Sequence, residues 1–128
     1  MARRGRCNCG AVTFSVAAEP EAVGLCHCTT CQRETGGPFM AYMVVGLAAL
    51  TVTGTTASWR ETTDHRHFCP RCGTPLFATM DGDPDAEVRL GALDDASGLI
   101  PTFELWVDRR AAWLAPLPGA EQYERNRP

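Results

Sequence analysis

Apolar residues in this chain occur in short runs, several of which alternate with polar residues, and turn-forming residues separate the runs. Alternation at every second position, without a sustained repeat of 3.6 residues, is typical of β-strands. The pattern predicts strands at residues 11–17, 22–26, 39–45, 50–53, 58–62, 66–68, 76–80, 87–91 and 102–107. One short helical turn is expected at residues 29–34. The sequence therefore predicts an all-β fold.

The length of the chain favours one domain. A chain of 128 residues can bury one apolar core but is short for two ordinary ones, and it contains no repeat, low-complexity segment or linker. We therefore expect residues 1–128 to form a single domain. Residues 116–128, which include Pro116, Pro118 and Gly119, are expected to form a C-terminal extension of uncertain order.

The composition is that of a globular protein, with 45% hydrophobic and 21% charged residues. The longest apolar stretch, residues 39–50, contains Gly46 and is too short to cross a bilayer. The N-terminus is basic, as at the start of a signal peptide, but no apolar segment follows it. We therefore expect a cytoplasmic protein without a membrane partner.

The charged residues exclude several functions. The chain has 15 acidic residues against 12 positive ones and a net charge of -3, which disfavours nucleic-acid binding. All the positive residues are arginine. The absence of lysine excludes a lysine Schiff base, a pyridoxal-phosphate lysine and a P-loop lysine, since each requires a primary amine.

Seven cysteines are the feature that most needs an explanation. They form three groups: Cys7 and Cys9; Cys26, Cys28 and Cys31; and Cys69 and Cys72. A reducing compartment makes disulfides the weaker interpretation, whereas zinc needs ligand sulfurs roughly 3.8 Å apart and therefore close spacing on a turn. The Cys69-Pro-Arg-Cys72-Gly73 segment meets that need, because Gly73 can adopt a positive φ.

The cysteine count favours one closed and one open zinc site. Cys7 and Cys9 can join Cys69 and Cys72 if the chain curls at Gly10, which makes a four-sulfur structural site. The middle group then supplies three ligands and leaves one position open, as in a catalytic zinc. In the alternative, both zincs are structural and a histidine closes the second site; the candidates are His27, His65 and His67.

Longer motifs carry a family resemblance. They include Gly5-x-Cys7-x-Cys9-Gly10-Ala11-Val12-x-Phe14, Cys26-His27-Cys28-x-x-Cys31-Gln32-Arg33, Gly36-Gly37-Pro38-Phe39 and Arg66-x-Phe68-Cys69-x-x-Cys72-Gly73-Thr74-Pro75-Leu76-Phe77. Further matches are Gly91-x-Leu93-Asp94 and Asp108-Arg109-Arg110-Ala111-Ala112-Trp113. With these motifs, the chain resembles the glutathione-dependent formaldehyde-activating enzyme family, also called the centromere protein V domain, from Gly5 to about Trp113.

The resemblance implies a zinc-stapled "tent" of small antiparallel β-sheets with two zinc ions per chain. It implies that Cys7, Cys9, Cys69 and Cys72 hold a structural zinc, and that Cys26, Cys28 and Cys31 hold a catalytic one. The family's activity joins formaldehyde to the thiol of glutathione and gives S-hydroxymethylglutathione, which is a carbon-sulfur lyase reaction in reverse. The implied partners are a small thiol, such as glutathione, and an aldehyde.

The zinc chemistry and the substrate charge raise further expectations. Three thiolates weaken the Lewis acidity of the metal, so capture of the thiol is at least as plausible as polarisation of the aldehyde oxygen. Substrate carboxylates need positive anchors, and Arg33 is the first candidate, before Arg66, Arg109 and Arg110. Residues 36–39 can form either a pocket wall or a turn that enters a core strand.

One alternative function belongs to a different class. In it, both zincs only stabilise a non-catalytic β-scaffold that binds a protein partner. A nucleic-acid role ranks third, because the Cys69 to Cys72 turn is compatible with it but the net charge is not. The sequence determines neither the physiological substrate nor the oligomeric state.

Overall fold

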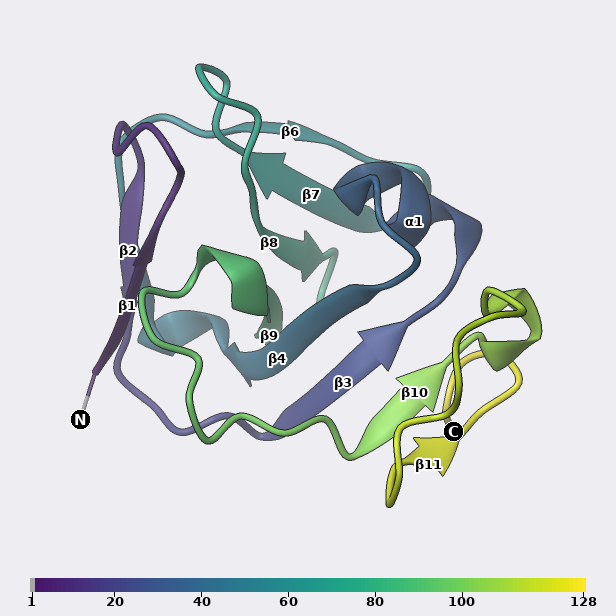
Figure 1. Cartoon of the computed structure of the whole chain (residues 1–128). Coiled ribbons are helices and arrows are strands. Elements are labelled where there is room, and N and C mark those ends of the chain that lie inside the picture. Colours follow the sequence, from purple (N-terminus) through teal and green to yellow (C-terminus); the bar gives the residue numbers. More distant parts are fainter. Residues whose placement is uncertain (1) are drawn as a thin grey trace.

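The computed structural model describes residues 2–128, and Met1 lies outside the described residues. Strands dominate the chain and pair into two sheets (Figure 1). The smaller sheet is antiparallel throughout, in the order β1 (Arg3–Arg6), β2 (Thr13–Val16), β5 (Leu50–Thr53). It lies at the end of the molecule opposite the C-terminal segment.

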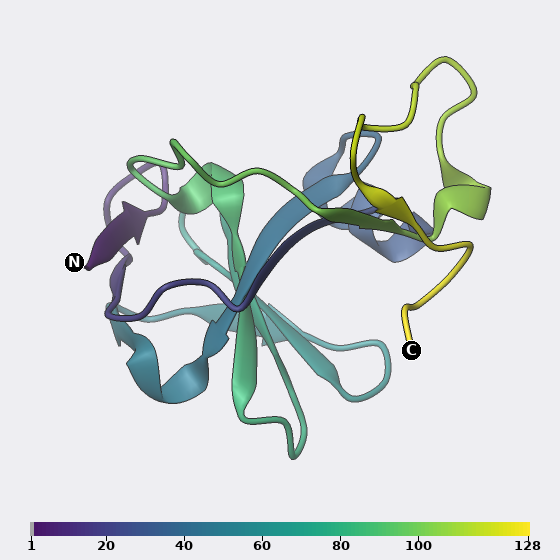
Figure 2. The same ribbon diagram turned by 90° about the horizontal axis from the view of Figure 1, so that it is seen from below.

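The larger sheet has eight strands and is strongly twisted (Figure 2). Its order is β11 (Glu121–Gln122), β10 (Phe103–Leu105), β3 (Ala22–Cys26), β4 (Met40–Gly46), β9 (Asp85–Arg89), β8 (Pro75–Met80), β7 (Asp64–Phe68) and β6 (Ala57–Trp59). Strand β10 pairs in parallel with both β3 and β11, whereas the other pairings are antiparallel. The sheet thus carries a parallel edge formed by the end of the chain.

Helical segments are short. The α-helix α1 (Thr29–Thr35) connects β3 to β4, and the 3-10 helices are η1 (Leu47–Ala49), η2 (Leu90–Ala92) and η3 (Val107–Arg109). Cys28 caps α1 by accepting a hydrogen bond from the Cys31 amide, and Gly36, at φ 70°, ends it. Among residues 2–128 no helix has the length and apolar character that crossing a bilayer requires.

Strand β4 separates two apolar clusters. On one face Met43 and Val45 are fully buried in a cluster that also contains Cys7 and Cys69. On the other face Tyr42 packs in a cluster with Cys26, Cys31, Met40 and Phe103. Because both faces are covered, the strand reads as a continuous apolar run. One cluster therefore includes cysteines from the first and third groups, and the other includes cysteines from the middle group.

The structure confirms the all-β prediction and the short helix after the cysteine cluster. The ranges 22–26 and 50–53 match β3 and β5. The strand expected at 102–107 is shorter because Trp106 has a φ of 57° and leaves the extended conformation. Strand β1 was not expected, since its sequence, Arg-Arg-Gly-Arg, has no apolar alternation.

Candidate metal centres and the adjoining cavity

Four cysteines from two distant loops meet beside the small sheet. Cys7 and Cys9 follow β1, and Cys69 and Cys72 follow β7; their sulfur atoms all lie within 4.8 Å of one another. The Cys7 and Cys9 sulfurs are 3.6 Å apart, and the Cys9 and Cys69 sulfurs are 3.8 Å apart. A tetrahedral zinc with thiolate ligands requires about 3.8 Å between sulfurs. We call this group the four-cysteine centre; its donors fit zinc.

Each loop of the four-cysteine centre turns at a glycine that directly follows its second cysteine. The Gly10 amide donates to the Cys7 carbonyl at 3.1 Å, and the Gly73 amide donates to the Cys69 carbonyl at 2.8 Å. Both glycines have a positive φ, 81° for Gly10 and 82° for Gly73. A side chain is disfavoured in that conformation, so the glycines allow each pair of cysteines to face one point.

Hydrogen-bond donors surround the sulfurs of this centre. The Val12 amide lies 3.2 Å from the Cys7 sulfur, and the Arg71 amide lies 3.4 Å from the Cys69 sulfur. A hydrogen bond with the Thr74 hydroxyl lowers the pKa of Cys72 to about 5. These donors stabilise thiolates, which are the form that binds metal.

The middle group of cysteines also converges. Cys26 ends β3, Cys28 caps α1 and Cys31 lies in its first turn, with the sulfurs within 4.8 Å of one another. We call this group the three-cysteine centre. Hydrogen bonding with the Cys26 thiol lowers the pKa of Cys28 to about 2, and the same interaction raises the pKa of Cys26. The thiolate form is therefore favoured at Cys28. The three donors are all sulfur atoms, a set that suits zinc.

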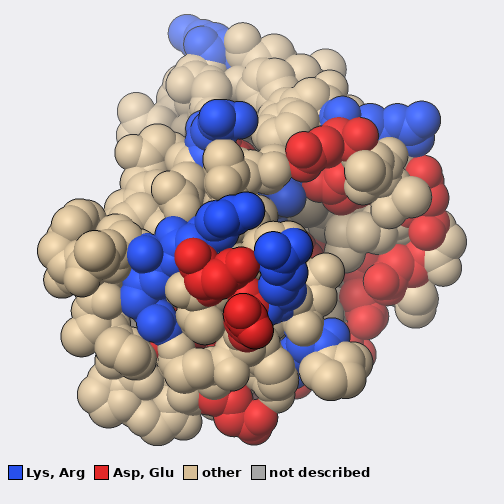
Figure 3. Space-filling view, turned by 90° about the vertical axis from the view of Figure 1, so that its right-hand side faces the viewer, with Lys and Arg blue, Asp and Glu red and all other residues tan. Residues whose placement is uncertain are grey.

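A cavity of about 520 Å³ adjoins the three-cysteine centre, and all three cysteines line it. Its other lining residues are Thr29, Thr30, Met40, Tyr42, Glu61, Thr62, Asp64, Arg66, Ala78, Met80, Glu87, Leu105, Trp106, Arg109 and Asn126. Figure 3 shows the face that carries α1 and the C-terminal strands, where acidic and basic groups are interspersed and acidic ones gather along one margin. Because all three cysteines line the cavity, a metal held by them would be accessible from it.

The histidines lie outside both centres. Within residues 2–128, neither group of candidate ligands includes a histidine. The imidazole of His27 is fully buried and faces Glu104; His65 lies 2.7 Å from Asp81; and His67 stacks on Phe77. The described residues therefore do not supply the histidine that a closed second site would need.

The four arginines expected as anchors do not gather at one place. Arg66 and Arg109 line the cavity. Arg33 lines a second pocket of about 390 Å³ with Trp59 and His67, and Arg110 pairs with Glu104 at 3.3 Å. Arg33 follows Cys31 by two residues in α1, which rotates its side chain about 200° around the helix axis. Closeness in sequence therefore does not bring Arg33 to the cavity.

Residues 36–39 form a turn that enters β4. Gly36 ends α1, and the ring of Phe39 packs against His27 with 5.7 Å between the ring centroids. None of residues 36–39 lines the cavity, whereas the next residue, Met40, does. Of the two interpretations of this segment, the structure favours the turn.

Several cavity residues were not foreseen. Glu61, Asp64 and Glu87 give the cavity an acidic wall, and Trp106 and Asn126 line it from the C-terminal part of the chain. Burial raises the pKa of Glu87. These residues come from segments far apart in sequence, and only strand pairing brings them together. No local motif could have identified them.

Known proteins resemble this chain over most of its length. The family model described as glutathione-dependent formaldehyde-activating enzyme matches residues 2–109. A Halomonas elongata protein, provisionally named a glutathione-dependent formaldehyde-activating enzyme, is 34% identical over 87 residues, which are 60% of this chain and 55% of that protein. An uncharacterized lyase of Schizosaccharomyces pombe is 28% identical over 74 residues, 57% of this chain and 54% of that protein. The chain thus spans about half the length of these relatives.

A solved structure supports the fold. A crystal structure of a Rhodobacter sphaeroides protein superposes with a TM-score of 0.61 and 22% sequence identity. The match covers 74% of this chain and 91% of that one. At this identity the likeness concerns the architecture alone.

Proposed function

The chain belongs to the glutathione-dependent formaldehyde-activating enzyme family, and from this premise we propose that it is a zinc-dependent carbon-sulfur lyase that acts on a thiol-aldehyde adduct. The observation that carries the proposal is the contrast between the two centres. Four sulfurs complete one centre, whereas three sulfurs line a cavity of about 520 Å³ at the other. Three protein ligands with an open position are the arrangement of a catalytic zinc.

The proposal assigns the ligands of two zinc ions. Cys7, Cys9, Cys69 and Cys72 would hold a structural zinc, and Cys26, Cys28 and Cys31 would hold the catalytic one. All these thiols are free of disulfides, which suits the reducing cytoplasm that we propose as the location.

The proposed reaction joins a thiol to formaldehyde. The sulfur forms a bond to the carbonyl carbon, the π electrons of the carbonyl group move to its oxygen, and that oxygen gains a proton as the thiol loses one. The lyase direction breaks the same sulfur-carbon bond and returns the proton to sulfur. When bound, zinc would supply an open position for the soft thiol sulfur and would favour its thiolate form.

Residues of the cavity can serve this reaction. Burial raises the pKa of Glu87, which is the direction required of a carboxyl group that carries a proton near neutral pH. Met40, Leu105 and Trp106 provide apolar wall around the three-cysteine centre and limit the access of water to it. We assign proton transfer to Glu87 and exclusion of water to these walls.

Arg109 is our first candidate for binding a carboxylate of the thiol substrate. It is exposed, it lines the cavity, and no carboxylate of residues 2–128 forms an ion pair with its guanidinium group. Arg33, in the neighbouring pocket, remains a second candidate. A free guanidinium at the mouth of the cavity can bind a carboxylate through two parallel hydrogen bonds.

The reaction can be tested by exchange spectroscopy with ¹³C-formaldehyde and glutathione. We expect the zinc-loaded protein to accelerate exchange between free and thiol-bound formaldehyde, and Cys28→Ser to lose at least ~100-fold of that acceleration. Arg60→Gln, at an exposed ion pair, is the control and should retain the rate. If the intact protein does not accelerate exchange, the result favours the scaffold alternative. If Cys28→Ser keeps the wild-type rate, the three-cysteine centre is not the site of the reaction.

A further inference from the structure

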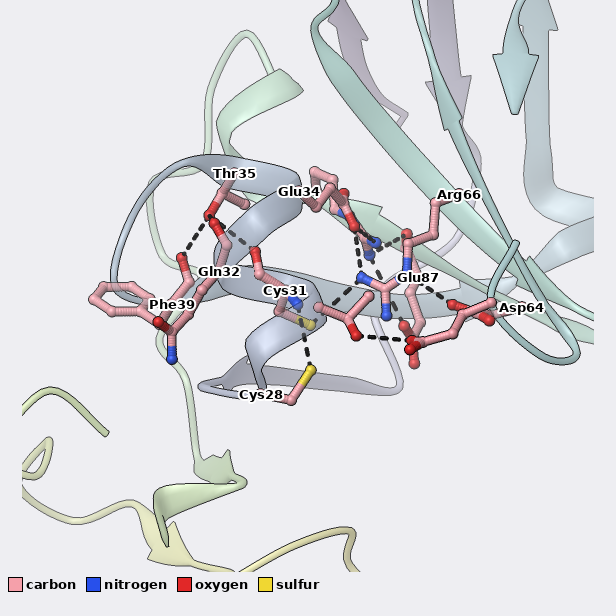
Figure 4. A network of polar contacts seen from close by, with 12 residues as sticks. Cys28, Cys31, Gln32, Glu34, Thr35, Phe39, Asp64, Arg66 and Glu87 are labelled. Carbon is pink, nitrogen blue, oxygen red and sulfur yellow. Dashed lines mark hydrogen bonds and ion pairs between the residues drawn. The ribbon is translucent and has the colours of Figure 1, made fainter. Parts of the chain in front are cut away.

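Arg66 connects the three-cysteine centre to a buried set of charged side chains (Figure 4). Its Nη1 atom lies 3.5 Å from the Cys31 sulfur and 2.6 Å from Oε1 of Glu34, and its Nε atom lies 2.7 Å from Oδ2 of Asp64. The side chain is only 13% exposed, and it lines the cavity beside the three cysteines. An arginine that touches a candidate metal ligand can alter what that ligand does.

We propose that Arg66 is a positioning residue that sets the charge density on the Cys31 sulfur and thereby tunes the affinity and reactivity of the three-cysteine centre. The inference rests on the proposed function, because it requires that Cys26, Cys28 and Cys31 hold zinc. It adds a residue that acts through a ligand and need not touch the substrate.

The surrounding ion pairs hold Arg66 in place. Glu34 accepts two hydrogen bonds from Arg89, from Nε at 2.7 Å and from Nη2 at 2.8 Å, and the side chains of both residues are only 5% exposed. Glu34 and Asp64 accept hydrogen bonds from different nitrogen atoms of Arg66. Since a guanidinium is planar, two such contacts fix the direction of the donor that meets Cys31.

The effect on the metal centre follows from charge. One zinc ion and three thiolates sum to -1, and the burial of Cys31, which is 2% exposed, makes that charge costly. Arg66 and Arg89 offset the charges of Glu34 and Asp64, and Glu87 lies 3.8 Å from Arg89, so the network directs a cationic donor at the sulfur from among carboxyl groups. Such a donor draws electron density from the thiolate and leaves the metal better able to accept a substrate sulfur.

The four-cysteine centre provides a comparison within the same molecule. The donors to its sulfurs are the Val12 and Arg71 amides and the Thr74 hydroxyl, and no arginine side chain of residues 2–128 donates a hydrogen bond to them. The side-chain contact from Arg66 is thus confined to the centre that faces a cavity. A network with a purely structural role would not need to touch the ligand.

The first test measures zinc affinity by chelator competition in the full chain. Arg66→Gln should weaken zinc binding at the three-cysteine centre about 10-fold to 100-fold, because loss of the cation beside the buried, negatively charged centre outweighs the stronger electron donation of the Cys31 sulfur. The four-cysteine centre should be unchanged. Cys28→Ser identifies which of the two affinities belongs to the three-cysteine centre. The Arg66→Gln protein should still fold, because Glu34 keeps both hydrogen bonds from Arg89.

The second test is spectroscopic and does not depend on activity. With Co²⁺ in place of zinc, Arg66→Gln should move the thiolate-to-cobalt charge-transfer band to longer wavelength, since the sulfur becomes a better electron donor. Arg66→Lys keeps the positive charge but loses the planar guanidinium, so its band should lie between those of the wild type and Arg66→Gln. Arg60→Gln should give the wild-type band.

The outcomes separate this inference from the proposed function. Wild-type affinity and an unchanged cobalt band in Arg66→Gln would overturn the role of Arg66, as would equal weakening of both centres. Failure of the intact protein to bind metal at Cys26, Cys28 and Cys31 would instead overturn the proposed function.

Discussion

The Nε2 atom of His27 lies 2.7 Å from Oε1 of Glu104, and neither side chain is more than 2% exposed. His27 stands between Cys26 and Cys28, whereas Glu104 lies in β10. The other oxygen of Glu104 accepts hydrogen bonds from the Leu117 amide at 2.8 Å and from the Gln122 side chain at 2.7 Å. One buried carboxylate therefore joins the three-cysteine segment to the end of the chain.

Replacing Glu104 with Gln should destabilise the protein. Burial disfavours the charged carboxylate, but hydrogen bonds from the Leu117 amide, Gln122 and His27 lower its pKa from 4.5 to about 2. Because the folded state has the lower pKa, the stabilisation is complete above pH ~4.5 and is lost as the pH falls toward ~2. The difference corresponds to about 3 kcal/mol. We expect Glu104→Gln to lower the free energy of unfolding in urea by about that amount at pH 7.

The pH dependence provides the check on Glu104. The difference between wild type and Glu104→Gln should shrink as the pH is lowered from ~4.5 to ~2, and comparing the two proteins removes the effect of metal loss that both share. Glu121→Gln, at an exposed position that accepts from the Tyr123 hydroxyl, is the matched control and should have little effect. A Glu104→Gln protein as stable as wild type at pH 7 would contradict the assignment.

Removing the four-cysteine centre should unfold the chain more completely than removing the other. Cys69 is fully buried in the cluster that joins the two sheets, and a structural zinc contributes on the order of 10 kcal/mol to folding. We expect Cys69→Ser to lose most of the dispersion of its amide NMR signals, whereas Cys28→Ser, at the edge of a cavity, stays folded. The opposite ranking would reverse the structural and catalytic assignments.

Short-range signals in the sequence were enough to predict part of the four-cysteine centre and several strands. Cys69 and Cys72 lie on one turn that ends at Gly73, so their spacing alone indicates that both sulfurs face one point. Strands β3 and β5 are short apolar or alternating runs between turns, and their ranges could be read directly. At these positions the local sequence favours the same conformation as the complete fold.

The cavity could not be predicted, because its residues meet only through strand pairing. Arg33 is next to the cysteines in sequence but turns away on α1, whereas Arg66 reaches Cys31 from β7. The parallel pairing of β10 and the left-handed conformation of Trp106 are also set by tertiary contacts, and neither has a local signal. The missing information was the order of the strands.

The parallel pairing of β3 with β10 depends on a glycine. Gly24 lies opposite Phe103, and a β-carbon at Gly24 would overlap the Phe103 ring. That ring is 3% exposed and is covered by Arg127, whose guanidinium carbon lies 4.0 Å from the ring centroid, so the ring has little room to move. Overpacking of this kind costs about 1–3 kcal/mol. We expect Gly24→Ala to lower the free energy of unfolding in urea by that amount.

The loss in Gly24→Ala should be concentrated at the C-terminal edge of the sheet, because β10 borders β3 and β11 there. Hydrogen exchange should therefore quicken first at the Thr102 amide, which donates to the Val23 carbonyl, and at the His27 amide, which donates to the Leu105 carbonyl. Gly46→Ala in β4 is the matched control, since a β-carbon there meets no atom within 4 Å, and it should be neutral. Equal effects of the two substitutions would show that β10 is held by contacts other than its fit against Gly24.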